Sequence, residues 1–474
     1  MDQATRKKYN YWQWRTLIIL MIGYALFYFV RKNFSIAMPA LNSELGLTKT
    51  QLGLFLTLNG VIYGLSRLVN GFLADRFSRK KMMALGLLLS AIVNIAIGFI
   101  PAVNSFFNVL DASGKATLGF VYILGSLWLI NGYVQGMGYP PCSSLMAHWV
   151  KPSELATKQS IWNASHSIGA GLLALMIGAI LGKFTNAAWQ WCFWAPAILA
   201  IGGAAMIFFG LKDTPASVGL PSPEEMDGHK ATVATGQEED PEITKLAYSK
   251  FVKKLAVGNP IIWIIAAADF FVYVIRFTIL DWGSTILVDF KNIDITLAAS
   301  IIGACEIVGG ILGMLFAGWA TDKFFKSRAQ RTSAICTIMA VVCLAGFWLV
   351  KDIPWLFISL LVLSAFFIYG PQALLGIAAS NQATKRAAAT ANGLVGIVAY
   401  LSPIVSGAVF GLLADSKWGW HGVFVAAIAM GIVGTVLLLL LWNKPADGYA
   451  KADELMKEVY AEYEQKKALN AFGK

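Results

Sequence analysis

Long apolar runs recur along the whole 474-residue chain, separated by short polar segments. Each run is close to the roughly 20 residues that a helix needs to cross a bilayer, and most carry no central charge. We predict twelve such helices, over residues 16–40, 50–74, 81–101, 118–142, 156–182, 188–211, 260–288, 296–320, 332–350, 354–379, 388–414 and 420–442. The pattern therefore predicts an all-α membrane protein with twelve transmembrane helices.

Polar segments divide these helices into two groups of six. Residues 1–211 are predicted to form an N-terminal six-helix half, and residues 259–443 a C-terminal one. Residues 212–258 contain the polar run PSPEEMDGHKATVATGQEEDPE and are predicted to be a flexible cytosolic linker. Residues 444–474 are predicted to be a cytosolic tail.

Composition excludes several classes of protein. The chain is 57% hydrophobic and only 14% charged, which is too apolar for a soluble chain of this length. Its net charge of +11 does not predict nucleic-acid binding, because the basic residues lie between apolar runs. The five cysteines form no C-x-x-C pair, so we expect neither a disulfide framework nor a metal centre. We expect no cofactor.

The distribution of Lys and Arg predicts the orientation. Basic residues concentrate at the N-terminus, in the 75–81 and 322–331 segments, in the linker and in the tail. The positive-inside rule then places both termini in the cytosol. The run MDQATRKKYNYWQWR leads into a span too long and too aromatic for a cleaved signal peptide. The absence of a targeting segment favours a bacterial inner (plasma) membrane.

The two halves repeat each other. The segment YFVR at 28–31 corresponds to YVIR at 273–276, and GFLADR at 71–76 corresponds to GWATDK at 318–323. Two matched landmarks at nearly the same offset indicate two pseudo-symmetric six-helix halves, with a binding site near their interface.

Several motifs resemble a known family. The segment GFLADRFSRK at 71–80, the twelve spans and the long central segment resemble the major facilitator superfamily. Within it, YALFYFVRKNF at 24–34, QGMGYPPC at 135–142 and WNASH at 162–166 resemble the organophosphate:phosphate antiporters. That family includes the glycerol-3-phosphate and hexose-phosphate carriers and the glucose-6-phosphate translocase.

The second half looks nearest to the hexose-phosphate members of that family. The segments concerned are LDWG at 280–283, EIVGG at 306–310 and YGPQ at 369–372. The resemblance implies a major facilitator fold and exchange of a phosphate ester for inorganic phosphate.

Two arginines within spans are candidates for binding phosphate. A charge inside a bilayer costs at least a few kcal/mol, so it indicates function. Arg31 shares a helix face with Tyr24 and Tyr28, and Arg276 shares one with Tyr273. Two guanidinium groups suit a phosphate monoester, which carries a charge of about −1.5 to −2. The alternatives are that each arginine pairs structurally with a carboxylate, or that it snorkels.

The first half holds further candidates. Arg67 follows Tyr63 by one turn, at a position where the resembled carriers commonly have lysine. It would attract the anion or form a structural ion pair. His166, Trp162 and Asn163 are predicted to line one helix face. The resemblance implies that this histidine contacts or responds to the phosphate, whereas a lone histidine in a helix is more often a packing residue.

Four other charged residues suggest gating. Lys32 and Asp281 are rotated away from the two arginines on their helices, and we expect them to meet across the halves as a gating ion pair. Glu306 is another candidate partner, and a static pair within one half is the alternative. Asp269 shares the face of Arg276 and would neutralise it or titrate.

Neutral side chains complete the predicted site and leave the function partly open. Tyr369 and Tyr400, like Tyr63, would donate hydroxyl groups to the ligand, or they would only pack. We expect a monomeric antiporter in the bilayer, with hexose phosphate favoured over glycerol 3-phosphate. A membrane sugar-phosphate sensor and a proton symporter using Asp269 or Glu306 are the alternatives. The sequence shows no nucleophile–base pair of the kind that catalysis uses, so we do not expect an enzyme.

Overall fold

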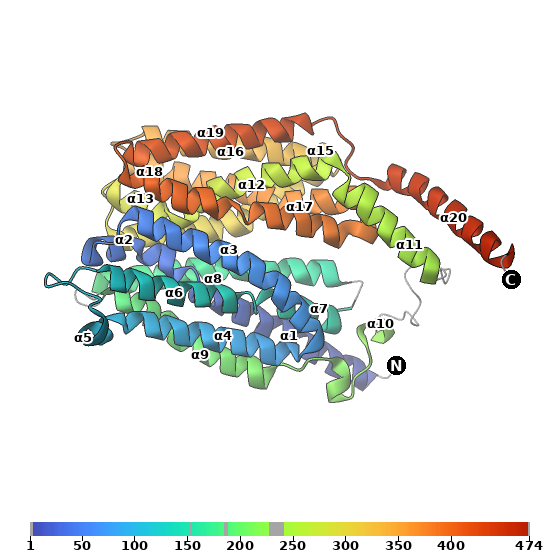
Figure 1. Cartoon of the computed structure of the whole chain (residues 1–474), viewed down its shortest axis with the longest axis horizontal. Helices are drawn as coiled ribbons and strands as arrows, with labels where there is room; N and C mark the ends of the chain where they lie inside the picture. The colour runs from blue at the N-terminus through green and yellow to red at the C-terminus, as the bar shows by residue number, and fades with distance from the viewer. Residues whose placement is uncertain (1–2, 152–153, 184–187, 227–240, 473–474) are drawn as a thin grey trace. The chain divides into compact units, whose positions relative to one another are not determined.

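The computed structural model describes residues 3–151, 154–183, 188–226 and 241–472, and the regular elements within them are helices (Figure 1). The α-helices are α1 Gln3–Phe29, α2 Asn33–Leu45, α3 Lys49–Arg76, α4 Arg79–Gly98, α5 Asn104–Phe107, α6 Leu118–Gln135, α7 Tyr139–Trp149, α8 Leu155–Lys183, α9 Ala188–Gly210, α10 Pro223–Met226, α11 Pro241–Phe251, α12 Pro260–Asp281, α13 Gly283–Asp289, α14 Ile295–Ala304, α15 Met314–Phe325, α16 Ala329–Leu349, α17 Pro354–Ala399, α18 Phe410–Asp415, α19 Gly419–Leu440 and α20 Tyr449–Phe472. Short 3₁₀ turns occupy Ile100–Val103 and Pro215–Val218, and π-helical stretches occupy Val252–Val257, Cys305–Gly313 and Ile404–Val409. The predicted all-α class is confirmed.

Twelve membrane spans are present within the described residues, as the hydrophobic pattern predicts. Away from its ends, a helix satisfies its backbone N–H and C=O groups internally, which lipid cannot do. Polar residues just outside the apolar runs start several of the helices. Thr48 and Gln51 form a capping box at the start of α3, and Ser78 and Asp294 cap α4 and α14.

The tenth and eleventh spans run into one another as α17. The separation predicted between 354–379 and 388–414 shrinks to a single interruption at Thr384, whose φ is +57°. A residue with a side chain rarely adopts this left-handed conformation, so the helix direction changes there. The two spans are Pro354–Thr384 and Arg386–Asp415.

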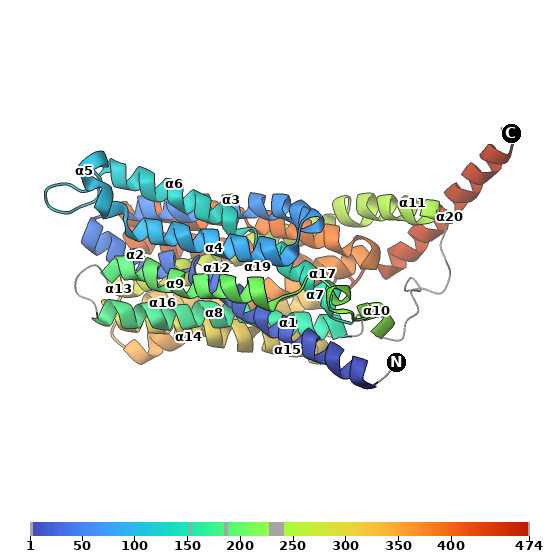
Figure 2. The same ribbon diagram turned by 90° about the horizontal axis from the view of Figure 1, so that it is seen from below.

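The chain forms two compact units. The first contains Met1–Ala231, Phe277–Ile311 and Pro403–Phe424. Within it, α1 packs on α8, α8 packs on α14, and α4 packs on α9 (Figure 2). α3 closely approaches the π-helical stretch Ile404–Val409. This approach depends on glycine, because a Cβ at Gly53 would lie 2.2 Å from the carbonyl oxygen of Gly407. Segments of the second sequence half therefore pack against the first half.

The second unit contains Thr232–Arg276, Leu312–Ser402 and Val425–Lys474. It includes α11, most of α12, α15 to α17, most of α19, and α20. Within it, α16 packs along α17, and α11 packs on α20. The two compact units thus divide the chain differently from the predicted sequence halves.

The predicted flexible linker is wrong at both of its ends. At its start, Leu220 is buried in the core of the first unit, and the Asp213 carboxylate accepts hydrogen bonds from Ser78 Oγ at 2.6 Å and the Lys80 amide at 2.8 Å. At its end, α11 and the π-helical stretch replace the expected coil. Residues 227–240 of the predicted linker lie outside the described part of the chain.

The tail is an ordered helix rather than a simple extension. Val459 of α20 is fully buried against Ile243 and Ala247 of α11. Two ion pairs flank this contact, Lys250–Glu462 at 2.6 Å and Lys254–Glu458 at 2.7 Å. Figure 1 shows α20 alongside α11. We name these two helices the α11–α20 pair.

Candidate functional site

The first membrane span is not one continuous helix. α1 and α2 stop short of one another, and residues 30–32 form a turn between them. The helix predicted over 16–40 is wrong at this point. The side chains of Arg31 and Lys32 leave the turn toward different partners.

Two arginines of the first unit stack on tyrosine rings. Arg31 Cζ lies 4.0 Å from the centre of the Tyr28 ring and 4.7 Å from that of Tyr63. Arg67 Cζ lies 5.8 Å from the Tyr63 ring and 4.2 Å from the Tyr139 ring. Tyr63 is therefore in contact with both guanidinium groups. The structure brings together the predicted residues of α3 and those of the first span.

Aromatic side chains continue this cluster on its other side. The rings of Tyr24 and Trp162 have centroids 4.9 Å apart, and Tyr139 lies 5.7 Å from Trp162. Tyr24 also lies 5.6 Å from Tyr28. Sequence reasoning did not select Tyr139 as a site residue. The available signal was its place in the family-like segment at 135–142.

His166 of α8 belongs to the same cluster. Its ring lies 5.5 Å from that of Tyr28 and is 5% exposed. Its Nδ1 contacts the carbonyl oxygen of Asn163, which can only accept, so Nδ1 carries the proton. Its Nε2 lies 3.3 Å from Ser167 Oγ. Trp162 is buried, but Asn163 is exposed, so the three predicted residues of this face do not share one environment.

The second unit contains a similar cluster around Arg276. Its Cζ lies 5.7 Å from the centre of the Tyr273 ring and 5.1 Å from that of Tyr369. The Tyr273 ring in turn lies 5.9 Å from that of Tyr400. Asp269, two turns earlier on α12, is 4% exposed, and its Oδ1 accepts no hydrogen bond from the described residues. Four predicted site residues of this unit are thus brought together.

The two clusters repeat the same local geometry. In each, an arginine stacks on the tyrosine three residues before it, Arg31 on Tyr28 and Arg276 on Tyr273, and on a second tyrosine from another helix. The guanidinium N–H donors lie in the plane of the group, and Arg31 hydrogen-bonds Tyr63 as well as lying over its ring. Such an arrangement can present N–H groups edge-on to an anion. The convergence of the two clusters on one pocket stays a prediction.

Lys32 and Asp281 form an ion pair within the first unit. The Asp281 carboxylate also accepts a hydrogen bond from Ser35 Oγ at 3.2 Å, and Lys32 Nζ lies 5.2 Å from the centre of the Phe277 ring. The pair joins residues from the two sequence halves, so the alternative of a pair within one half is wrong. The partner of Lys32 is Asp281 and not Glu306, which is buried in a π-helical stretch.

Comparison with known proteins identifies the family. Residues 20–407 match the sequence profile of the Major Facilitator Superfamily. The chain belongs to the major facilitator superfamily. It is 33% identical over 93% of its length to a probable hexose phosphate transport protein of Chlamydia trachomatis, 93% of which is covered. It is 36% identical over 93% of its length to the glycerol-3-phosphate transporter of Bacillus subtilis, with 95% covered.

A third relative is the membrane sensor protein UhpC of Salmonella typhimurium, 31% identical over 92% of each chain. The chain thus groups with the sugar-phosphate and glycerol-3-phosphate transporter family of the superfamily. The crystal structure of a bacterial homologue of the human lysosomal transporter Spinster matches 97% of the chain and 99% of its own length, with a TM-score of 0.68 and 14% identity. This likeness confirms the major facilitator fold. The bacterial relatives and the twelve spans indicate a multi-pass inner-membrane protein.

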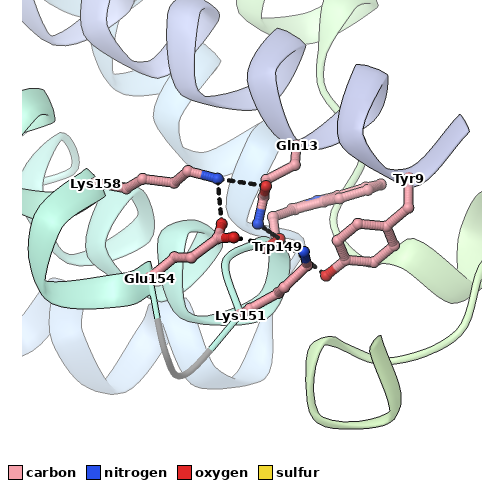
Figure 3. A network of polar contacts seen from close by, with 6 residues as sticks. All are labelled: Tyr9, Gln13, Trp149, Lys151, Glu154 and Lys158. Atoms are coloured by element: carbon pink, nitrogen blue, oxygen red, sulfur yellow. Dashed lines mark hydrogen bonds and ion pairs between the residues drawn. The ribbon is translucent and has the colours of Figure 1, made fainter. Parts of the chain in front are cut away.

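One polar network of this major facilitator protein was not predicted from the sequence. Figure 3 shows it where α1, α7 and α8 meet. Tyr9 Oη and Gln13 Nε2 donate to the Trp149 carbonyl at 3.0 and 3.2 Å, and Lys158 Nζ donates to Gln13 Oε1 and, at 2.6 Å, to Glu154 Oε2. The hydrogen bond from Lys158 lowers the pKa of Glu154. This network ties the start of α1 to α8.

Proposed function

We propose that this protein is a secondary active transporter that exchanges a phosphorylated metabolite for inorganic phosphate. The observation that carries the proposal is the pair of matching clusters, in which Arg31 and Arg276 each stack on two tyrosines. The repeat in the sequence relates these positions, and transporters built from such repeats bind substrate near the interface of the halves. Relatives named for hexose phosphate and glycerol 3-phosphate transport support the same substrate class.

Phosphate recognition would begin with the two arginines. Arginine keeps its charge when it is desolvated and offers a planar set of donors to phosphate oxygens. In the first unit, Arg67 adds a further positive charge beside Tyr63. His166, with its proton on Nδ1, and the hydroxyl groups of Tyr24, Tyr28 and Tyr63 would bind further oxygens. Tyr273, Tyr369 and Tyr400 would do so from the other half.

Alternating access would turn this binding into exchange. Two arginines that face one pocket repel each other when the pocket is empty, and closing the pocket would remove them from water. A bound phosphate or phosphate ester offsets this cost, because it carries the opposite charge. The loaded carrier would therefore change conformation faster than the empty one. That difference makes the two fluxes obligatorily coupled.

Lys32 and Asp281 would act as a gate beside the binding site. Their ion pair is part of the first unit, and their side chains are only 12% and 11% exposed. Breaking and remaking such a pair during the cycle would bias the carrier between two states. Asp269 and Glu306, both buried, are the remaining candidates for charge compensation.

The direct test is uptake into proteoliposomes loaded with or without internal phosphate. We expect uptake of labelled glucose 6-phosphate only into loaded vesicles. Equal uptake in both would reject coupled exchange. Uptake that does not depend on internal phosphate but is lost when an uncoupler is added would instead indicate proton symport.

The organic part of the substrate is proposed to be a hexose. The segments at 280–283, 306–310 and 369–372 look nearest to the hexose-phosphate carriers. Competition of labelled phosphate exchange by a panel of esters tests this choice. Stronger competition by glycerol 3-phosphate than by glucose 6-phosphate would reverse it. The protein is further proposed to act as a monomer, with both termini in the cytosol.

A sensor is the second candidate, because UhpC is a relative of similar length and identity. A sensor would bind the ester but carry little flux. Binding of glucose 6-phosphate to the purified protein, measured together with exchange in proteoliposomes, separates the two functions. Binding without exchange would favour the sensor.

A further inference from the structure

The turn at 30–32 exposes a backbone carbonyl to the protein interior. The Val30 oxygen lies in the turn that follows α1, and it accepts two side-chain hydrogen bonds. Asn94 Nδ2 of α4 donates at 3.1 Å, and Asn131 Nδ2 of α6 donates at 2.9 Å. Two different helices therefore hold one peptide group of the first span.

These two asparagines are themselves held in place. Asn94 Nδ2 also donates to the Ser90 carbonyl at 2.8 Å, and Asn94 Oδ1 accepts from Asn33 Nδ2 at 2.8 Å. Asn131 Oδ1 accepts from Ser90 Oγ, which in turn accepts from Gln135 Nε2 at 2.7 Å. We name Asn33, Asn94 and Asn131 the asparagine cluster.

The asparagine cluster is closed to bulk solvent. Asn33, Asn94 and Asn131 are all 0% exposed, as is Ser90. A buried polar group that loses its hydrogen-bond partner is destabilised. A change in either amide would therefore alter the hydrogen bonding of the Val30 carbonyl directly.

The held peptide group is the one that precedes Arg31. A peptide unit is planar, so holding its oxygen also restrains the Arg31 nitrogen and Cα that share the plane. Arg31 stacks on Tyr28 at 4.0 Å, and the next residue, Lys32, turns to Asp281. The turn between α1 and α2 is therefore the backbone from which both cations reach their partners.

We propose that Asn94 and Asn131 are positioning residues that hold the Val30 carbonyl and thereby aim Arg31 at the phosphate group of the substrate. The inference rests on the proposed function, because it assigns Arg31 to the phosphate. Neither asparagine touches the substrate. Their effect on binding passes through the backbone of the turn.

The test measures inorganic phosphate exchange by the full-length protein in proteoliposomes. Asn131→Ala and Asn94→Ala each remove one donor to the Val30 oxygen. We expect the KM for phosphate to rise about tenfold, equivalent to about 1.4 kcal/mol, with Vmax changed less than about twofold. Asn59→Ala is the matched control, since Asn59 is also buried and donates one bond, at 3.1 Å, to the Trp128 carbonyl of α6. The Asn59→Ala variant should have the same KM for phosphate as the unaltered protein.

A double-mutant cycle separates positioning from mere stabilisation of the bundle. If Asn131 acts through Arg31, Asn131→Ala should raise KM much less in an Arg31→Lys background than in the unaltered protein. Equal rises in both backgrounds, or a fall in Vmax at constant KM, would overturn the inference. The milder Asn131→Ser, checked by thermal unfolding, replaces Asn131→Ala if the latter does not fold.

The outcome for Arg31 itself distinguishes this inference from the proposed function. If Arg31→Ala leaves the KM for phosphate unchanged, the proposed function fails. If Arg31→Ala abolishes phosphate exchange while both asparagine variants keep the normal KM, only the positioning role fails.

Discussion

Lys32 and Asp281 are 249 positions apart in the sequence, yet their side chains form an ion pair in the first compact unit. Lys32 follows the broken end of α1, and Asp281 is the last residue of α12. Ser35 donates a further hydrogen bond to the same carboxylate oxygen at 3.2 Å. The contact thus holds the start of α2 against the end of α12 within this unit.

Removing one member of this pair should slow phosphate exchange more than removing both. Lys32→Ala or Asp281→Ala leaves one poorly hydrated charge without its partner, a change that typically costs about 3–5 kcal/mol for a buried pair. We expect each single variant to slow phosphate exchange at least about tenfold, and the double variant to recover part of the loss. Exchange rates in proteoliposomes measure both effects.

The matched control for this prediction is Lys49→Ala. Lys49 pairs with Asp289 at 3.0 Å in the same unit, but its side chain is more exposed, at 19%. Lys49→Ala should change exchange less than about threefold, since the contribution of an ion pair falls as its exposure to solvent rises. A double variant as slow as the product of the two single losses would contradict a coupled pair.

The three arginines should differ in their tolerance of lysine. Arg31→Lys and Arg276→Lys keep the charge but lose the planar donor set, and we expect the KM for phosphate to rise about 10- to 150-fold. Arg67→Lys introduces the residue common in the resembled carriers, and Arg67 contacts Tyr139 by its ring face at 4.2 Å. We expect a rise of less than about threefold, because an ammonium group also binds such a face. Equal sensitivity of all three positions in phosphate exchange would contradict these roles.

The membrane fold could be predicted well from the sequence because its signal is local. A run of about 20 apolar residues has few alternatives to a membrane helix. The repeat at 28–31 and 273–276 is visible in the residue types alone. In the structure, both copies have an arginine over the ring of the tyrosine three residues earlier. Residues three apart on a helix, such as Tyr273 and Arg276, are neighbours whatever the rest of the chain does.

The features that escaped prediction depend on residues far apart in the sequence. The turn at 30–32 accepts hydrogen bonds from Asn94 and Asn131, which lie on other helices. The residue pattern of the first span alone did not predict it. Tyr139 reaches Arg67 only because α7 packs against α3. The polar composition of 212–258 suggested coil, but its two ends fold against partners elsewhere in the chain.

The α11–α20 pair should be separable from transport. Val459 is fully buried against Ile243, so Val459→Asp would place a carboxylate in an apolar contact and detach α20. We expect faster proteolysis of the tail, with phosphate exchange changed less than about twofold. Glu458→Gln, which removes only the ion pair with Lys254, should leave the tail resistant. Loss of exchange in Val459→Asp would show instead that the helix pair takes part in the transport cycle.

Acid should weaken the network between α1 and α8 through Glu154. The hydrogen bond from Lys158 holds the pKa of Glu154 below its ordinary value, so the folded protein keeps the carboxylate ionised at a pH where the unfolded chain binds a proton. The stability from this group is complete above the ordinary glutamate pKa of about 4.3 and is lost as the pH falls through the lower folded value. The side chain is 40% exposed, so the loss should be under about 1 kcal/mol.

We expect the Tm to fall less between about pH 5 and pH 3.5 in Glu154→Gln than in the unaltered protein. Glu464→Gln, in an exposed carboxylate of α20, should keep the original slope. Equal slopes for Glu154→Gln and the unaltered protein would assign the acid sensitivity to other groups.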